Sequence, residues 1–317
     1  MTKQIRPHAH PDRRAVVLAT LGVVLAAFCW GISAIFAKGA FERGIPPVRM
    51  AEARIAVAGI PLLLYLLLRR RDLLVPPRAA RGAILVFGLG LVAVNAAYYT
   101  AIDRLPVGIA ISIQYTGPVL VLIFSALMLR RAPDRRIWAA GLVTLAGAVL
   151  VSGAYAGLGS LDPLGVAAAA VSAITFAIYL LSAEAAGRWG AHSATTLGIG
   201  FLVAAVAWGA WLPWWSWPFD RLADPEIVLR VLGVGLVGTL LPFLLMVTAL
   251  RVISAGVAGI AATSEPVFAS GLAWLLLGQA LELPQLVGGA LVVAGVVLAQ
   301  VTRGGAAGES VAVEVAA

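Results

Sequence analysis

Glu265 and Pro266 stand side by side in the middle of an apolar stretch that runs from Val252 to Leu277. Glu265 is the only charged residue of this stretch, which is about long enough to cross a bilayer, since a helical span needs roughly 20 apolar residues. A carboxylate at that depth costs at least ~2.5 kcal/mol unless it faces a partner, water or a ligand. Pro266 removes one backbone hydrogen bond. The pair therefore predicts a broken helix that carries a polar site.

The carboxyl group of Glu265 has two interpretations. In the first, it binds an amino group of a ligand or carries a proton, as intramembrane acids often do. In the second, it is hydrogen-bonded to groups that the neighbouring Pro266 leaves free, and its role is structural. The sequence favours neither interpretation over the other.

The same pattern occurs in the first half of the chain. Shifting the sequence by 148 positions places Pro118 on Pro266 without a gap. Further identities in this register are Gly90/Gly238, Thr100/Thr248, Ala101/Ala249, Gly108/Gly256, Gly141/Gly289, Ala146/Ala294, Gly147/Gly295 and Leu150/Leu298. The chain is therefore a tandem of two similar halves. Repeated hydrophobic segments that Gly or Pro interrupts indicate the central binding site of a transporter.

Several other polar or aromatic side chains lie inside apolar stretches and are candidates for the same site. They are Gln114 and Tyr115 just before Pro118, and Trp30, Ser33, Asn95, Tyr98, Tyr99 and Tyr179. Asn95 and Tyr99 are four residues apart and share a helical face. Gln114 either contacts the ligand or makes an interhelical hydrogen bond. Gly108, Ser112 and Thr116 form a small-residue stripe, which allows close helix approach or leaves room for a ligand.

Arg54 and Glu52 lie near the start of an apolar stretch at 48–68. Arg54 could recognise a carboxylate from outside, but the favoured interpretation is an interfacial arginine that extends its guanidinium group to the membrane surface. Apart from Arg54, no Lys or Arg lies well inside an apolar stretch. Sugar phosphates and nucleotides need fixed cations, so a zwitterion or neutral polar metabolite fits better, with Glu265 opposite the ammonium group.

Composition excludes a soluble globule. Hydrophobic residues make up 61% of the 317 residues, charged residues 12%, and the mean hydropathy is +0.97. The net charge of +8 comes mostly from arginines between apolar stretches, which is typical of cytoplasmic loops and not of a nucleic-acid surface. The lone Cys29 excludes an internal disulfide. No cleavable signal peptide is evident, so the first span is expected to remain in the mature protein.

Other motifs give no support to an enzyme or a cofactor. Residues 233–238 fit G-x-G-x-x-G, but no strand surrounds them, so packing is the favoured role of these glycines. His8, His10 and His192 have no Cys or acid at ligand spacing, and no metal site or other cofactor is expected. No Ser/His/Asp or Cys/His constellation can be assembled, so no catalytic residue is expected. The tryptophans at 211–217 are interpreted as an interfacial belt.

The apolar runs predict ten transmembrane helices in an all-α integral membrane protein. Their expected ranges are 15–37, 48–68, 82–102, 106–129, 137–153, 164–183, 195–215, 228–250, 252–277 and 284–302. The halves are thus 15–153 and 164–302, between tails at 1–14 and 303–317. Residues 304–317 are Gly/Ala-rich, and we expect them to be disordered.

Charge sets the expected orientation. With the N-terminus inside, 16 of the 23 Lys and Arg residues fall on that side of the membrane and 7 on the other. The positive-inside rule then places both termini in the cytoplasm. Because each half has an odd number of spans, the second half must enter the membrane in the opposite sense, so the repeat is expected to be inverted.

Four segments resemble the EamA-type members of the drug/metabolite transporter superfamily. They are Cys-Trp-Gly-Ile-Ser at 29–33, Ala-Arg at 53–54, Thr-Ser-Glu-Pro-Val-Phe at 263–268 and Gly-Ala-Leu-Val-Val-Ala-Gly at 289–295. Within that superfamily, residues 104–118 and 176–187 are most similar to the threonine/homoserine exporter branch. Two positions depart from that branch: Gln114 replaces an acid, and Gly278-Gln279 replaces Gly-Glu.

The resemblance implies a function as well as a fold. It implies ten helices in inverted repeats, a cavity formed mainly by the first, third, fourth, sixth, eighth and ninth helices, and export of amino acids or related metabolites. The expected location is a bacterial-type cytoplasmic membrane, and the expected working unit is a monomer. The alternatives are a transporter of another metabolite or drug class, a channel-like or lipid-handling protein, and an integral-membrane enzyme.

Overall fold

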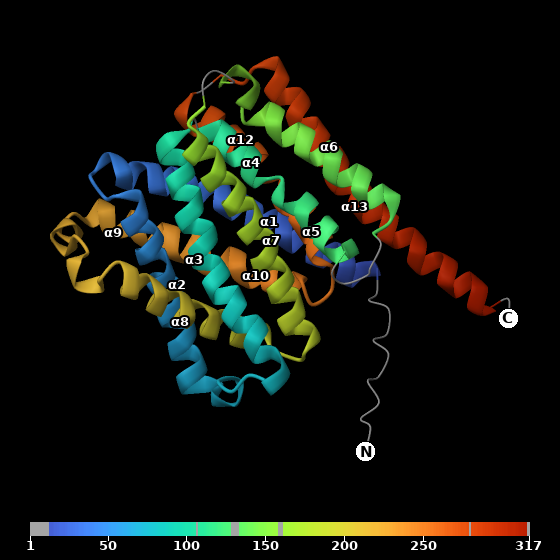
Figure 1. Ribbon diagram of the computed structural model, residues 1–317, viewed down its shortest axis with the longest axis horizontal. Coiled ribbons are helices and arrows are strands. Elements are labelled where there is room, and N and C mark those ends of the chain that lie inside the picture. The colour runs from blue at the N-terminus through green and yellow to red at the C-terminus, as the bar shows by residue number, and fades with distance from the viewer. Residues whose placement is uncertain (1–12, 106, 128–132, 158–160, 279, 316–317) are drawn as a thin grey trace.

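A computed structural model of the protein describes residues 13–105, 107–127, 133–157, 161–278 and 280–315. All regular structure in these ranges is helical (Figure 1). The first half comprises α1 (Arg13–Glu42), α2 (Pro47–Arg69), α3 (Arg81–Arg104), α4 (Val107–Gln114), α5 (Gly117–Leu127) and α6 (Arg135–Val151). The second comprises α7 (Pro163–Arg188), α8 (Ser193–Trp211), α9 (Pro225–Leu232), the π-helix η6 (Gly233–Leu240), α10 (Leu241–Ala249), α11 (Ala255–Ala262), α12 (Glu265–Leu277) and α13 (Leu283–Val315).

Short 3-10 helices occupy several connections between these elements. They are η1 (Arg71–Leu73), η2 (Arg78–Ala80), η3 (Ala154–Gly157), η4 (Trp214–Ser216) and η5 (Phe219–Ala223). Because α4 continues into α5, α9 through η6 into α10, and α11 into α12, the helices group into the ten segments that the sequence predicts.

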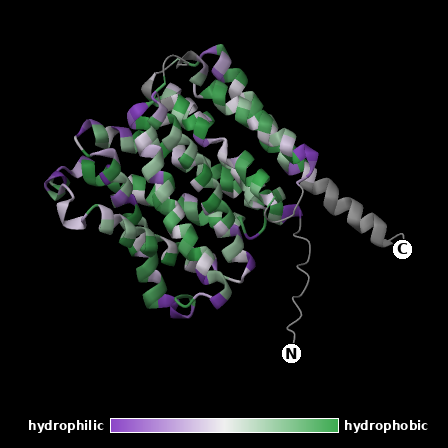
Figure 2. Ribbon diagram, in the orientation of Figure 1, coloured by the Kyte–Doolittle hydropathy of each residue, from purple (hydrophilic) through white to green (hydrophobic). Residues whose placement is uncertain are grey.

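The helical surface is that of a membrane protein. Eight helical segments of the described chain are long and apolar enough to cross a bilayer. Large apolar side chains remain exposed on the outside of the bundle, among them Leu68, Leu275 and Val301. Hydrophilic residues gather at the helix ends and in the connections, whereas the helices themselves are mostly hydrophobic (Figure 2). Since water would not cover such a surface at low cost, lipid must cover it, and the chain is a multi-pass membrane protein.

The predicted ranges differ from the structure chiefly at their ends. The segment predicted at 164–183 continues to Arg188, and the one predicted at 195–215 ends at Trp211, just before Pro213. The last helix, α13, extends to Val315, beyond the predicted end at residue 302. No proline follows Pro284, so no residue type in this segment forces the helix to end.

The helices of the two halves pair reciprocally. α1 packs on η6 and α10, and α7, its counterpart in the second half, packs on α3. α2 packs on α8, α5 on α11, and α6 on α13, which run side by side in Figure 1. Each contact between the halves therefore has an equivalent in which the roles of the two halves are exchanged. Such reciprocity is expected of two similar units that face each other across an approximate twofold axis.

Two glycines allow α6 and α13 to touch along their backbones. A Cβ atom added to Gly147 of α6 would lie 2.6 Å from the carbonyl oxygen of Gly288, and one added to Gly288 of α13 would lie 2.6 Å from the carbonyl oxygen of Gly147. Small residues at helix interfaces permit this close approach in membranes. The glycines therefore fix the distance between the last helices of the two halves.

Glu184 joins α7 to the beginning of α11. Its Oε2 accepts a hydrogen bond from the backbone N–H of Ala255 at 3.0 Å, and its Oε1 accepts one from Arg188 at 3.0 Å. The residue is buried. A carboxylate at a helix N-terminus is stabilised by the unpaired amides there, so Glu184 acts as a cap from a neighbouring helix.

We expect Glu184→Leu to lower the free energy of unfolding by about 2 kcal/mol, because it removes charge-assisted hydrogen bonds from a buried backbone amide. Glu184→Gln keeps an acceptor of the same shape and should cost less. Thermal unfolding of the purified variants in detergent measures both effects. Equal stability of the leucine variant and the wild-type protein would contradict the capping role.

Candidate functional site

Both proline-containing segments are broken helices, as the sequence predicts. The first is interrupted between α4 and α5 at Tyr115 and Thr116, and the second between α11 and α12 at Thr263 and Ser264. The hydroxyl of Thr116 donates to a carbonyl oxygen of the preceding turn at 2.7 Å, and that of Thr263 does so at 3.0 Å. These side chains bond carbonyl groups next to the breaks, where no water from the lipid side can reach.

The two breaks meet through one side-chain hydrogen bond. Tyr115 donates its hydroxyl hydrogen to Glu265 Oε2 over 2.8 Å. Tyr115 is buried, whereas Glu265 remains partly exposed. Glu265 is the first residue of α12, where the free backbone amides favour negative charge. A carboxyl group of the second half is thus held by a hydroxyl group of the first.

Further polar groups surround Glu265. Tyr98 of α3, Tyr179 of α7 and Arg54 of α2 all lie close enough to the Glu265 carboxyl group to interact with it electrostatically. Within the part of the chain that the structure describes, the hydroxyl groups of Tyr98 and Tyr179 make no hydrogen bond to another residue. Both are therefore available to a bound molecule.

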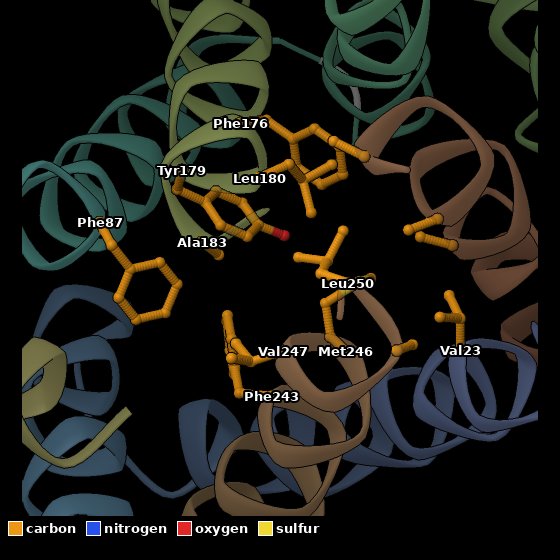
Figure 3. Close-up of a cluster of buried hydrophobic side chains, with 14 of the residues drawn as sticks. Val23, Phe87, Phe176, Tyr179, Leu180, Ala183, Phe243, Met246, Val247 and Leu250 are labelled. Atoms are coloured by element: carbon orange, nitrogen blue, oxygen red, sulfur yellow. The ribbon is translucent and has the colours of Figure 1, made fainter. Parts of the chain in front are cut away.

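An aromatic cluster positions Tyr179. Its ring contacts those of Phe176 and Phe243, with centroid distances of 5.1 and 6.1 Å. The hydroxyl oxygen points inward, towards the middle of the group of apolar side chains from α7 and α10 (Figure 3). Trp30 of α1 joins the same cluster, with its ring centroid 5.7 Å from that of Phe243. These contacts link the predicted site residues Trp30 and Tyr179 across the two halves.

Other predicted site residues make contacts within the bundle. Gln114 donates from Nε2 to the hydroxyl of Ser172 on α7 at 2.9 Å, which is the interhelical hydrogen bond of its second interpretation. Asn95 donates to the carbonyl oxygen one turn earlier in α3 at 2.7 Å. Tyr99 packs against the main hydrophobic cluster, beside Tyr98 at a ring-centroid distance of 5.8 Å.

Pro118 and the small-residue stripe both lie in closely packed surroundings. A Cβ atom added to Gly259 of α11 would lie 3.1 Å from Pro118, so the first break packs directly on the second broken helix. Pro266 is buried. On the stripe, the hydroxyl of Ser112 is 2.6 Å from that of Ser152, at the end of α6. Of its two interpretations, the stripe therefore shows close helix approach.

The interpretation of Arg54 as an arginine that extends to the membrane surface is wrong. Its Nε donates to the hydroxyl of Thr239 at 2.7 Å and its Nη2 to the carbonyl oxygen of Gly238 at 2.8 Å, both in η6. Glu52 pairs with Arg49 at 2.8 Å instead of with Arg54. Arg54 is therefore directed into the bundle and belongs to the surroundings of Glu265.

The π-helix explains why Arg54 turns inward. The hydroxyl of Thr239 donates to the carbonyl oxygen of Val234, five residues earlier, at 2.8 Å. A π-helical turn displaces carbonyl groups from regular α-helical bonding, and the Gly238 carbonyl is available to Arg54. The three glycines of the G-x-G-x-x-G match face side chains of α1 and α2, with Ser33 against Gly238. These contacts agree with the packing role that the sequence favours for these glycines.

Histidines and other metal-ligating residues form no site in the described chain. No group of three or more His, Cys, Asp or Glu side chains is arranged to hold a metal there. His192 accepts a hydrogen bond from the backbone N–H of Ala194 at the start of α8. His8, His10 and Gln279 lie outside the described residues.

Comparisons with known proteins agree on one family. The EamA-like transporter family matches residues 17–153 and 163–300, which is once per half. The threonine/homoserine exporter RhtA of Escherichia coli K12 is 29% identical over 67% of this chain and 68% of its own. An uncharacterized transporter of Archaeoglobus fulgidus is 30% identical over 87% of this chain and 94% of its own.

A solved structure shows the same fold. A protein known from a crystal structure superposes with a TM-score of 0.75, over 90% of this chain and 97% of its own, at 22% identity. This similarity concerns the fold alone. Two matches to one family, a duplicated ten-segment bundle and a polar centre between the halves lead to the same conclusion: the chain belongs to the EamA-like transporter family, and is a multi-pass secondary transporter of a small molecule, not an enzyme.

Proposed function

We propose that the protein exports amino acids or closely related zwitterionic metabolites across the cytoplasmic membrane. The observation that carries the proposal is the hydrogen bond between Tyr115 and Glu265, which places an ionisable group where the broken helices of the two halves meet. Inverted-repeat carriers bind their substrates at such breaks. The relatives named threonine/homoserine exporters support this substrate class.

In this proposal each side chain around the breaks has a distinct role. Glu265 binds the ammonium group, and Tyr115 orients the carboxylate that does so. Tyr98 and Tyr179 offer hydroxyl groups to polar parts of the substrate, and Trp30 contacts its apolar part. Because both breaks carry contacts, relative movement of the halves would open the site to one side of the membrane and then to the other.

Counterflow in proteoliposomes tests the substrate class. Vesicles that contain purified protein and unlabelled threonine should accumulate labelled threonine, whereas protein-free vesicles should not. A hexose phosphate of similar size should exchange much more slowly. Faster exchange of the sugar phosphate than of any amino acid would contradict the proposal, and absence of flux over a broad panel of amino acids would do so as well.

The proposed orientation places both termini in the cytoplasm, with the two repeats inverted. Residues that the charge count assigns to one side do lie together: Arg104 pairs with Asp162 at 3.3 Å, and Arg43 with Asp224 at 3.7 Å. These ion pairs support the division of the loops into two sides. Which side is cytoplasmic rests on the excess of Lys and Arg.

We expect cysteines introduced at Arg70 and Arg135 to react only with a membrane-permeant reagent in intact cells. Cysteines at Asp162 and Asp220 should also react with an impermeant one, because the proposed orientation exposes them outside. The background is Cys29→Ala, which removes a buried thiol. Reaction of position 70 with the impermeant reagent would show that the orientation is opposite to the proposed one. The description of the fold would remain unchanged.

A further inference from the structure

Arg54 is a cation inside a membrane span, and no carboxylate in the described chain pairs with it. It is the eighth residue of α2, roughly 10 Å along the helix from its first residue. Both of its hydrogen bonds go to neutral acceptors, Thr239 Oγ1 and the Gly238 carbonyl oxygen. Among the residues that the structure describes, no carboxylate oxygen lies within 4.0 Å of its guanidinium nitrogens.

Other arginines near the same ends of these helices differ from Arg54 in this respect. Arg43 and Arg230 both pair with Glu226, and Arg49 pairs with the buried Glu52. Acids are therefore present at this end of the bundle, and the fold uses them for the other arginines. Of these four arginines, Arg54 is the one whose described hydrogen bonds all go to neutral acceptors.

Glu265 shows the complementary arrangement. Its described hydrogen bond comes from the neutral hydroxyl of Tyr115, and no cation within the described residues forms an ion pair with it. Arg54 and Glu265 nevertheless lie close enough to interact electrostatically. Two opposite charges in a low-dielectric bundle would be most stable in direct contact, because each unpaired charge retains a large desolvation cost. Neutral partners instead hold them apart.

The neutral partners come from opposite halves of the chain. Arg54 belongs to the first half and is held by η6 of the second, whereas Glu265 belongs to the second half and is held by Tyr115 of the first. A molecule that contacts both charges would therefore contact both halves. A zwitterion offers the two complementary charges. Its binding would give both Arg54 and Glu265 an ion-pair partner, and the net charge of the site would stay the same.

We propose that Arg54 binds the carboxylate of the substrate while Glu265 binds its ammonium group. The inference rests on the proposed function, because it assigns the second charged contact of the same site. Nη1 of Arg54 is not used by any described residue, and a guanidinium group can bind a carboxylate through two nitrogens. The site therefore selects molecules that carry both charges and rejects amines and acids that carry one.

Three ligands of nearly equal size test this selectivity on the wild-type protein. Threonine carries both charges, threoninamide lacks the carboxylate, and 3-hydroxybutyrate lacks the ammonium group. We expect threonine to raise the melting temperature in detergent and to compete for labelled threonine at concentrations at least tenfold lower than either analogue. Threoninamide that stabilises and competes as well as threonine would overturn the role of Arg54, and this result needs no variant.

The Arg54→Gln variant then locates the selectivity. Its apparent affinity for threonine should fall at least tenfold, while its affinity for threoninamide changes less than twofold, so the preference for the carboxylate disappears. Arg54→Lys keeps a cation and should retain part of the preference. Arg104→Gln, which removes an arginine from an exposed ion pair with Asp162, is the matched control and should behave as the wild type.

The outcomes separate this inference from the function on which it rests. If the wild type exchanges threonine but Arg54→Gln keeps the same preference over threoninamide, the carboxylate contact is elsewhere and only the role of Arg54 fails. If the wild type exchanges no amino acid, the proposed function itself fails.

Discussion

Proteoliposomes that contain the Glu265→Gln variant should exchange threonine at least tenfold more slowly than those with the wild type, although the variant folds normally. Glutamine keeps the shape of the side chain and can still accept the hydrogen bond from Tyr115. It cannot offer a negative charge to an ammonium group, and loss of one member of a desolvated ion pair costs several kcal/mol of binding. Any dependence of the flux on the titration of Glu265 should also disappear.

The Glu265→Leu variant separates the two interpretations of this residue. If the carboxyl group has only a structural role, glutamine should leave transport intact, whereas leucine should lower thermal stability because the Tyr115 hydroxyl would then be buried without an acceptor. Near-wild-type flux in both variants, with unchanged pH dependence, would exclude Glu265 from the site. Melting temperatures in the same detergent are the control for folding in each case.

We expect Gly147→Ala to destabilise the protein by about 1–3 kcal/mol, because the added methyl group overlaps the backbone of α13. The nearest atoms are the carbonyl oxygen of Gly288 at 2.6 Å and the backbone nitrogen of Val292 at 2.8 Å, neither of which a side-chain rotation can move away. The melting temperature in detergent should fall by several degrees. Gly147→Leu, with a larger side chain, should prevent the two helices from packing.

Gly271→Ala is the matched control for this experiment. It is also a glycine-to-alanine change in a helix, but a Cβ atom at Gly271 would meet nothing within 4 Å. Alanine has the higher helix propensity, so this variant should be as stable as the wild type or slightly more stable. If both variants changed the melting temperature equally, close contact between α6 and α13 would not explain the effect of Gly147.

The sequence predicted what depends on local chemistry. Apolar runs of the length of a bilayer gave the ten segments, and Pro118 and Pro266 gave the breaks, because a missing N–H acts on its own helix wherever the helix lies. The pairing of Tyr115 with Glu265 was predicted only as a shared region. Tyr115 and Glu265 are 150 residues apart in the sequence. The repeat indicates that the two halves are equivalent, but it does not indicate which of their side chains are in contact.

Arg54 shows what the sequence could not provide. Whether an arginine near a helix end extends to the surface or turns inward depends on what the facing helix offers. Here the facing element is the π-helix at 233–240, whose Gly238 carbonyl and Thr239 hydroxyl accept its hydrogen bonds. The sequence predicted an ordinary helix at 228–250 and did not predict that residues 233–240 would be π-helical. The sequence also left open whether Gln114 contacts the ligand or another helix, because it does not show that Ser172 of α7 lies within hydrogen-bonding distance of Gln114.

The reciprocal pairing of the helices bears on how the protein is made. The broad faces of α3 and α6 are covered by α7 and α13, which belong to the second half and are synthesised later. Until then, α3 and α6 of the inserted first half lack these partners and have only their smaller contacts with α2, α4 and α5. The hydrogen bond between the two helix breaks must form after α12 is synthesised, because Tyr115 has no Glu265 to bond before that point. A chain that stops after the first repeat therefore lacks Glu265 and leaves exposed the surfaces of α3 and α6 that α7 and α13 cover in the complete protein.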